Sequence, residues 1–420
     1  MSSSSLQFLL FGTTEATSPN ADIGEEAKLP RRDWILLPSI GLLTICFIVI
    51  SVGWVAHKNF SRADSGLRNC LTMNPTDGVR GIPNSECWAK NAEASLVSYK
   101  INSCGHRAGM ECGPKPPGTY GIVMVGSSYP FGQDVPGEKT IAALLPPELA
   151  KQTGRRVELY NESMWSSYAR AVDLRFDETL AAQPDMILWV LTKNDVERAS
   201  TMMPDLIPPN AAGSTRSKIQ YRLKQMLAMQ SISEQAGFVL KYAKDLFRVS
   251  ETGAMLMHDL YQSRTLYLKA ALRKHSDLLW YLEAEPSETS RSFLQEFDGY
   301  ASEIAGKAKA AGVPLVVVLV PDRVQAAMIS AGEWPSDYNP YRLDEELRVM
   351  MESHGVTYID IFPGFRNVPN SEQYYFAVDG HPDERWQPII SGLLAQELTS
   401  GVIPALKAPA QERAALEGTK

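Results

Sequence analysis

Short apolar runs recur between residues 120 and 361, and they constrain the fold of this 420-residue chain more than any other feature. Each run is followed by polar turn residues and then by a helix-like segment. The runs are 120–125, 157–160, 186–191, 315–320 and 357–361. Near-continuous apolar runs are typical of strands buried on both faces, and strands that alternate with helices form parallel sheets. The sequence therefore predicts a three-layer α/β/α domain over residues 119–400. Its candidate helices are 139–150, 168–182, 343–353 and 388–398.

The connection between the third and fourth runs is unusually long. It covers roughly 200–305, whereas an ordinary connection between a strand and a helix has about 2 to 6 residues. The lack of proline between residues 210 and 285 predicts helices. From Ser214 to His275 the segment holds eleven Lys and Arg against four Asp and Glu. This basic insertion is either a helical face with solvated charges or a cap over the functional site that binds anionic headgroups or an acidic glycan.

A stretch of 22 residues without a formal charge, 35–56, lies near the N-terminus. As a helix it spans roughly 33 Å, enough to cross the hydrocarbon core of a membrane. Trp34 and Trp54 lie near its two ends, where interfacial aromatic residues are favoured. More than thirty mostly polar residues precede it, unlike the start of a cleaved signal peptide. We therefore expect one uncleaved transmembrane helix, and the alternative is a buried core helix.

The cysteines indicate on which side of the membrane the large domain lies. Cys46 falls within the apolar stretch, and the other four follow it: Cys70, Cys87, Cys104 and Cys112. Four closely spaced cysteines in a polar segment are typical of two disulfides, with three possible pairings. A zinc site is the alternative, but the segment has no close Cys-x-x-Cys pair. The basic residues that flank the span are equal in number on both sides, so the cysteines decide, and we expect an extracytoplasmic domain, in the bacterial periplasm.

The remaining segments complete the expected domain organisation. Residues 1–34 are predicted to be a disordered cytoplasmic tail, 57–118 a cysteine-bearing stalk and linker, and 401–420 a second disordered tail. A hydrophobic content of 44% and a charged content of 21% are ordinary for a globular protein. The net charge of -7 gives no general attraction to phosphate backbones, so we expect no nucleic-acid partner. The sequence leaves the oligomeric state open.

Polar residues of complementary kinds follow the predicted strands, at the edge where parallel sheets bind ligands. The first strand is followed by Ser127 and Ser128, and the third by Asn194. Asp379 and His381 come just before the last predicted helix. A serine hydroxyl becomes a nucleophile when a neutral imidazole accepts its proton and a carboxylate holds the other ring nitrogen. Together with an uncharged amide donor for an oxyanion, these residues predict an acyl-transfer site.

Each of these residues also has a plainer interpretation. Ser128 could be a turn serine, and Asp379 and His381 could belong to a Gly-Pro turn. Asn194 could cap the following helix. The five other histidines have no carboxylate neighbour in such a loop, so His381 is the candidate base.

The four blocks resemble, in order and position, those of the SGNH (GDSL-type) hydrolase superfamily, whose members have a flavodoxin-like sheet. The resemblance covers residues 119 to about 400 and is interrupted by the insertion. It implies that Ser128 is the nucleophile, His381 the base and Asp379 the residue that orients the base. It also implies three oxyanion donors: the backbone N–H of Ser128, the backbone N–H of Ser163 and the side chain of Asn194. No metal and no organic cofactor is implied.

The chain departs from the family pattern at four positions. Ser127 stands where Asp is usual, Ser163 and Ser166 stand where glycines are usual, and Thr192 stands where glycine is common. We expect Ser127 to cost a structural hydrogen bond. Ser163 is expected to restrict the backbone and the close approach of a substrate. Asp195 is expected to brace its loop rather than to react.

Three further residues are expected to bind the substrate: Tyr129, Asn161 and Trp165, although aromatic residues beside a site are often only packing. The sequence thus predicts a membrane-anchored, extracytoplasmic serine esterase or deacetylase that hydrolyses acyl esters, carried by an envelope glycan or a lipid. Three alternatives stay open. An O-acyltransferase of envelope polysaccharide would use the same triad with a sugar hydroxyl as acceptor, and a carbohydrate-binding or scaffold protein of the same fold would not catalyse at all. A purely structural anchor is the third, but it gives no reason for polar residues to gather at the strand ends.

Overall fold

The computed structural model describes residues 32–64, 69–74, 76–107, 113, 115–202, 247, 250–274 and 277–407. The chain divides into two compact units, Met1–Val52 and Gly53–Lys420. Most of the expected N-terminal tail, Cys112, the larger part of the basic insertion and the end of the C-terminal tail lie outside the described residues.

Helix α1 (Asp33–Phe60) contains the uncharged stretch 35–56. It has 28 residues and is long and apolar enough to cross a membrane. Asp33 lies in its first turn and His57 and Lys58 in its last, so its terminal charges complement the helix dipole. The helix extends four residues beyond the predicted span at its C-terminal end, because residues 57–60 continue the helical hydrogen bonding.

The five predicted apolar runs form one parallel sheet. Its strands are β6 (Thr119–Gly126), β7 (Arg156–Asn161), β8 (Met186–Leu191), β9 (Leu315–Leu319) and β10 (Thr357–Tyr358), in the order β10-β9-β8-β6-β7. Numbered along the chain this is the flavodoxin-like order, with its switch point between β6 and β8. Every residue of β6, β8 and β9 is buried, so helices cover both faces. The predicted fold class is confirmed.

The last strand is shorter than its apolar run. Thr357 and Tyr358 pair with β9, and the N–H of Ile359 still donates to the carbonyl of Val317. The carboxylate of Asp360 then accepts the N–H of Phe362 at 2.9 Å, which begins helix α14 (Phe362–Phe365). The Asp side chain therefore ends the strand inside the run 357–361.

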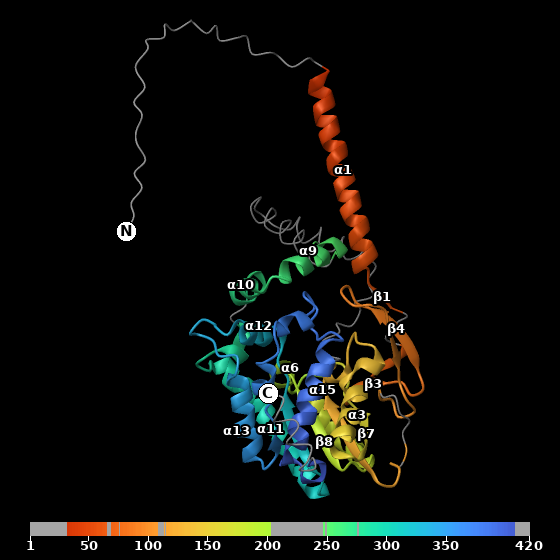
Figure 1. Cartoon of the computed structure of the whole chain (residues 1–420), viewed down its shortest axis with the longest axis vertical. Helices are drawn as coiled ribbons and strands as arrows, with labels where there is room; N and C mark the ends of the chain where they lie inside the picture. Colours follow the sequence, from red (N-terminus) through yellow and green to blue (C-terminus); the bar gives the residue numbers. More distant parts are fainter. Residues whose placement is uncertain are drawn as a thin grey trace, which may run out of the picture. The chain divides into compact units, whose positions relative to one another are not determined.

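Helices form a layer on each face of the sheet (Figure 1). In one layer α3 (Ile141–Thr153) contacts α15 (Trp386–Glu397). In the other, α11 (Glu288–Ala311) contacts α4 (Ala169–Leu174), α5 (Phe176–Ala181) and α6 (Lys193–Glu197). The remaining described elements of the domain are α2 (Ser128–Phe131), η2 (Gly137–Lys139), η4 (Asp277–Leu282), α12 (Arg323–Ala331), α13 (Arg342–Ser353), η5 (Ser371–Tyr374), η6 (Leu398–Val402) and η7 (Pro404–Leu406).

Helix α11 corrects the predicted end of the insertion. Its apolar face is buried at Phe297, Ala301 and Ile304, so the helix is the crossover that returns the chain to β9. The expected insertion, 200–305, therefore ended too late. The amphipathic spacing of α11 is the same as that of an inserted helix, and only its packing distinguishes the two.

The described part of the insertion is helical, as expected. It comprises α9 (Glu251–Tyr261) and α10 (Arg264–Lys274). The hydroxyl of Ser250 caps α9 by accepting the N–H of Gly253 at 3.0 Å. Helix α10 contacts α12 of the α/β domain, so these two helices are joined to the core.

The predicted tail 401–420 begins inside the folded domain. Ile403 and Leu406 are buried, and residues 398–406 form two short helical turns after α15. Apolar side chains placed just after the last helix extend the core to this point. The domain therefore reaches at least residue 407.

Residues 63–107, which we call the N-terminal β module, fold into two small antiparallel sheets instead of the expected stalk. One sheet has the order β1-β4-β5, with β1 (Ala63–Asp64), β4 (Glu86–Lys90) and β5 (Val97–Lys100), and the other pairs β2 (Leu71–Asn74) with β3 (Gly78–Gly81). A disulfide joins Cys70 to Cys87, and both sulfur-bearing side chains are buried. Cys104 is disulfide-bonded too.

The module packs against the α/β domain. Its buried residues Val79, Val97 and Tyr99 form one apolar cluster with Phe131 and Met164 of the domain. The disulfide and this shared cluster explain why a short polar segment folds here. The ammonium of Lys90 holds the end of α1 by donating to the carbonyls of Asn59 at 3.2 Å and Ser61 at 2.8 Å.

Candidate active site

Ser128 lies at the switch point of the sheet, where β6 turns sharply into α2. The turn needs Gly126, which has a φ of 149° and approaches β8 so closely that a Cβ would lie 2.4 Å from the carbonyl oxygen of Val190. Ser128 is the first residue of α2, and among the described residues no group accepts its backbone N–H. The side chain is largely buried. The sequence therefore places a hydroxyl and an open N–H at one point of the sheet edge.

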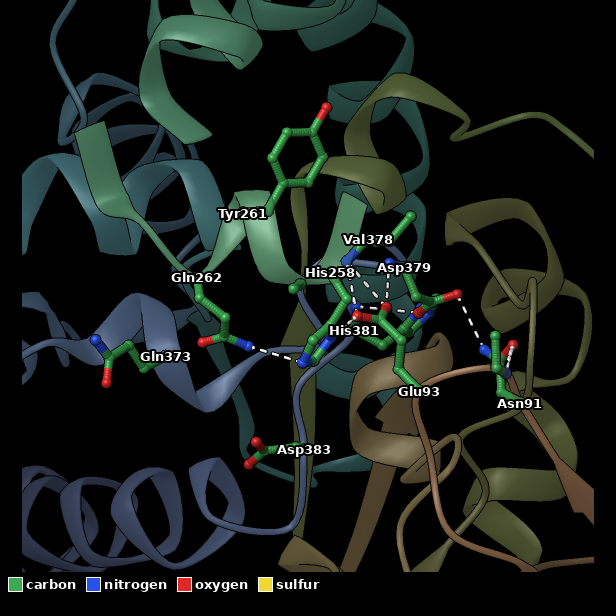
Figure 2. A network of polar contacts seen from close by, with 12 residues as sticks. Asn91, Glu93, His258, Tyr261, Gln262, Gln373, Val378, Asp379, His381 and Asp383 are labelled. Atoms are coloured by element: carbon green, nitrogen blue, oxygen red, sulfur yellow. Dashed lines mark hydrogen bonds and ion pairs between the residues drawn. The ribbon is translucent and has the colours of Figure 1, made fainter. Parts of the chain in front are cut away.

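The loop before α15 brings His381 and Asp379 to this serine. The Nε2 atom of His381 lies 2.9 Å from the Oγ atom of Ser128. The Nδ1 atom lies 2.5 Å from Oδ1 of Asp379, which also accepts the backbone N–H of His381 at 3.2 Å. Gly380, with a φ of 84°, makes the turn between the two residues. The structure thus brings the three predicted residues into one hydrogen-bonded chain, whose His381–Asp379 part is shown in Figure 2.

The carboxylate of Asp379 stays ionised in this loop. Burial alone would raise its pKa, but hydrogen bonds from His381 and Asn91 outweigh that effect, and the pKa is lowered. An ionised carboxylate at Nδ1 favours the tautomer that carries the proton there. Nε2 is then free to accept the proton of Ser128.

Tyr129 contacts the histidine loop. Its hydroxyl donates to the carbonyl of Gly380 at 3.1 Å, and its ring centroid lies 5.5 Å from that of His381. Burial raises the pKa of Tyr129 well above 10, so the phenol remains a donor. Substrate binding by Tyr129 stays a prediction, and the contacts that the structure shows are to the histidine loop.

Asn161 and Ser163 are also placed differently from the expectation. Asn161 is fully buried: its Nδ2 donates to the carbonyl of Pro130 at 3.0 Å, and its Oδ1 accepts the N–H of Ser163 at 3.1 Å. Asn161 therefore ties β7 to the Ser128 turn, and its buried amide is not exposed to a substrate. The N–H of Ser163 is used inside the protein and is not available as an oxyanion donor in this structure.

Two residues just beyond Met164 offer an alternative. The backbone N–H groups of Trp165 and Ser166 have no partner among the described residues, and Ser166 has a left-handed φ of 55°. The ring of Trp165 is partly buried against the apolar cluster of the β module, which fits the packing interpretation.

The residues after β8 form a buried brace. The carboxylate of Asp195 accepts the backbone N–H of Thr192 at 2.8 Å and its hydroxyl at 2.6 Å. It also accepts the hydroxyl of Ser127 at 2.9 Å. Burial raises the pKa of Asp195 to about 6. Ser127 was expected to lose a structural hydrogen bond, but it makes one. Its hydroxyl donates to the carboxylate of Asp195, which would repel the carboxylate of an Asp at position 127.

Asn194 is the second residue of α6, and Thr192 is the residue at its N-cap. The capping interpretation of Asn194 is therefore wrong. Its side chain makes no hydrogen bond to another residue that the structure describes, so its amide donors are unused within that part of the chain.

Sequence reasoning missed two residues of the β module. The Nδ2 atom of Asn91 lies 3.1 Å from Oδ2 of Asp379, and Glu93 accepts the backbone N–H of Asp379 at 2.8 Å (Figure 2). Both lie almost 290 residues from the loop they contact, within a segment interpreted as a stalk. No local sequence signal marks either residue.

Solved structures similar to this chain include TesA and two esterases. TesA is 13% identical in sequence, and the match covers 67% of this chain and 98% of the TesA chain with a TM-score of 0.35. The esterase EstA from Pseudoalteromonas, inhibited by monoethylphosphonate, is 9% identical with 67% and 97% covered and a TM-score of 0.34. A mutant of the acetyl-xylooligosaccharide esterase Axe2 from Geobacillus stearmophilus is 14% identical with 66% and 94% covered and a TM-score of 0.34.

Other similar structures are described as acylhydrolases and lipases. No protein-family model matches the chain, and a search of curated proteins finds no match. With TM-scores of 0.35 or less, these likenesses add no weight to a function, and what the site can do rests on its own geometry.

Proposed function

We propose that this protein is a serine hydrolase that cleaves acyl esters. The observation that carries the proposal is the hydrogen-bonded chain from Ser128 through His381 to Asp379. This arrangement activates a hydroxyl for attack on a carbonyl carbon, and a merely structural turn would not need all three groups aligned.

The geometry supports a two-step reaction. In the first step Oγ of Ser128 bonds to the ester carbonyl carbon while Nε2 of His381 takes the hydroxyl proton. The tetrahedral intermediate collapses, the bond to the alcohol oxygen breaks, and His381 returns the proton to that leaving group. In the second step water repeats the attack on the acyl-serine with His381 again as base, which releases the acid and restores the serine.

The oxyanion of the intermediate needs hydrogen-bond donors. The open N–H of Ser128 and the free amide of Asn194 supply two. We assign the third to the N–H of Trp165 or Ser166, because the N–H of Ser163 is bound to Asn161. Losing one such donor typically costs about 2.7 to 4 kcal/mol of barrier.

The chain carries features of a membrane-anchored enzyme of an oxidising compartment. Helix α1 meets the length and composition of a transmembrane anchor, and the β module holds the Cys70–Cys87 disulfide. We infer that the domain lies outside the cytoplasm, in the periplasm of a bacterium. Acyl esters on an envelope glycan or a lipid are then the accessible substrates.

The test uses the full chain in detergent micelles and a short-chain aryl ester, p-nitrophenyl acetate. Wild type is compared with Ser128→Ala and with Ser98→Ala, a control that removes an exposed hydroxyl on β5. We expect turnover by wild type and Ser98→Ala, none above background by Ser128→Ala, and a phosphonate adduct found by mass spectrometry on Ser128. No turnover and no adduct in a folded wild type would contradict the proposal.

The same preparation separates hydrolysis from transfer. A sugar acceptor is added together with the ester, and the acylated sugar is measured beside the free acid. Acid release that is independent of the acceptor supports the hydrolase, whereas acceptor-dependent acyl-sugar as the main product would show an O-acyltransferase that uses the same three residues.

A further inference from the structure

The loop that connects β4 to β5 of the β module reaches the reacting loop of the α/β domain. We propose that Asn91 and Glu93 of this connecting loop are positioning residues that hold Asp379, and through it His381, in the reactive geometry. The inference rests on the proposed function, since it assigns these two residues a part in the same reaction.

Asn91 fixes the carboxylate of Asp379. Its Nδ2 donates to Oδ2 of Asp379 at 3.1 Å, while Oδ1 of that carboxylate faces His381. The same amide nitrogen donates to Oδ2 of Asp134 at 3.1 Å, and its Oδ1 accepts the N–H of Ala92 at 2.8 Å. All polar atoms of the side chain are thus used. With Oδ2 held by Asn91, the carboxylate cannot rotate away from the imidazole without breaking a hydrogen bond.

Asn91 also separates two carboxylates. Burial raises the pKa of Asp134, the nearby charge of Asp379 adds to that rise, and the hydrogen bond from Asn91 opposes it. Because the neutral amide of Asn91 donates to both carboxylates, it offsets part of the repulsion between Asp134 and Asp379. The other ionisable groups around the Asp379 loop are His381, Glu93, His258, the buried Tyr129 and Arg323, which donates to the carbonyl of Ala377.

Glu93 fixes the backbone of the reacting loop. Its carboxylate accepts the N–H of Val378 at 2.9 Å and the N–H of Asp379 at 2.8 Å. Its side chain is only 2% exposed. Two successive backbone donors on one carboxylate determine the direction in which the loop leaves Val378, and so where Asp379 presents its side chain.

A third donor to Glu93 comes from the insertion. Nδ1 of His258 on α9 lies 2.6 Å from Oε1 of Glu93, and Nε2 of His258 is 3.0 Å from the side chain of Gln262 (Figure 2). Glu93 therefore joins three segments that are distant in sequence: the β module, α9 and the Asp379 loop. The buried carboxylate has a partner in each neighbour, as buried charges require.

The two residues contribute little to the interior of the β module itself. The apolar cluster of the module centres on Tyr99, Val97 and the Cys70–Cys87 disulfide, whereas Asn91 and Glu93 lie in the loop beyond the strands. Their contacts are polar and directed at the reacting loop and at α9. A role in positioning accounts for this distribution, and support of the module's own fold does not.

The test measures steady-state hydrolysis of p-nitrophenyl acetate by the full chain in detergent micelles, with Asn91→Ala, Glu93→Ala and wild type. We expect kcat to fall about 10- to 100-fold with KM changed less than about 2-fold, because misplacing a reacting group affects the chemical step more than binding. The rate of Ser128 labelling by a phosphonate is expected to fall in parallel. Glu86→Gln removes an exposed acid at the end of β4 opposite that loop, and serves as the control.

Two conservative variants distinguish positioning from a general loss of structure. Asn91→Asp keeps the shape but places a third carboxylate between Asp134 and Asp379, so we expect the acidic limb of the kcat/KM profile to move up by about one pH unit. Glu93→Gln keeps an acceptor for the two loop N–H groups and is expected to retain more activity than Glu93→Ala.

The results that would contradict this inference differ from those that would contradict the proposed function. An inactive, unlabelled wild type would overturn the function. An active wild type whose Asn91 and Glu93 variants match Glu86→Gln in kcat and in pH profile would overturn only this inference. If Asn91→Ala does not fold, the isosteric Asn91→Asp decides, and an unshifted acidic limb in that variant contradicts the proposal.

Discussion

The α/β domain and the N-terminal β module obtain their structure in different ways. Strands β6, β8 and β9 bury every side chain, and each fully buried aliphatic side chain stabilises the fold by about 1.5 to 3 kcal/mol. In β4 of the module, buried and exposed residues alternate: Cys87 and Ala89 are buried, and Glu86 and Trp88 are exposed. A disulfide supplements this small core. On our proposal, the α/β domain carries the reacting groups and the module adds polar contacts to the loop of Asp379.

The largest expected effect lies in the core. His381→Ala removes the base from Ser128, and we expect kcat/KM to fall about ten-thousand-fold, with the unfolding temperature little changed. The hydrolysis rate and a thermal unfolding scan of the full chain check this. If His381→Ala kept an activity within tenfold of wild type, His381 would not be the base for Ser128.

The next effect concerns an oxyanion donor. Asn194→Ala is expected to lower kcat about 100- to 1000-fold, because the free amide of Asn194 stabilises charge that appears only in the transition state. KM should change little, since the ground-state carbonyl makes a weaker contact. Lys193→Ala, one residue earlier in α6, is the matched control, and equal losses in both variants would count against the assignment.

A smaller effect is expected when the module is loosened. Replacing Cys70 and Cys87 together by Ser removes a cross-link that should contribute about 2 to 4 kcal/mol to stability. We expect faster amide exchange in β2 to β5 and unchanged protection in β6, β8 and β9. The kcat should fall in the same direction as for Asn91→Ala. Uniform loss of protection in both regions would show that they unfold as one unit.

The smallest effect is expected inside the brace behind Ser128. The folded pKa of Asp195, about 6, lies above its ordinary value of 3.8, so the folded state retains a proton that the unfolded state releases. Stability contributed by this group therefore falls as pH rises from about 4 to about 6 and is level above. Ser127→Ala removes a hydrogen bond to the Asp195 carboxylate, so the folded pKa of Asp195 should rise further. The decrease in stability should then continue to higher pH, and the free energy of unfolding at neutral pH should fall by about 1 kcal/mol.

Unfolding temperatures measured between pH 4 and pH 8 check this, with Ser98→Ala as the control. Superimposable pH curves for Ser127→Ala and the control would show that the brace does not depend on the Ser127 hydroxyl.

The sequence was sufficient for the core because burial on both faces leaves a continuous apolar pattern. It was also sufficient to select Ser128, Asp379 and His381, since strand ends and the loop before the last helix converge in a parallel sheet. It was insufficient where the outcome depends on a partner distant in sequence. The N–H of Ser163 is taken by Asn161, whose side-chain direction no spacing reveals.

The module illustrates the same limit more strongly. Short strands that alternate buried and exposed residues around a disulfide leave no long apolar run, so residues 57–118 resembled a linker. The contacts of Asn91 and Glu93 exist only after the module has packed against the domain. Likewise, the end of the insertion could not be placed, because a crossover helix and an inserted helix share one periodicity.

The bond between Lys90 and the end of α1 defines the smallest fragment that preserves the reacting loop. The ammonium takes its two acceptors from the carbonyls of Asn59 and Ser61, and Lys90 directly precedes Asn91. A soluble fragment that begins after Ser61 would leave a half-buried cation without its acceptors next to the residue that holds Asp379. A fragment that keeps these contacts therefore begins within the last turn of α1, and a cleavage boundary designed for crystallisation or assay belongs before Asn59.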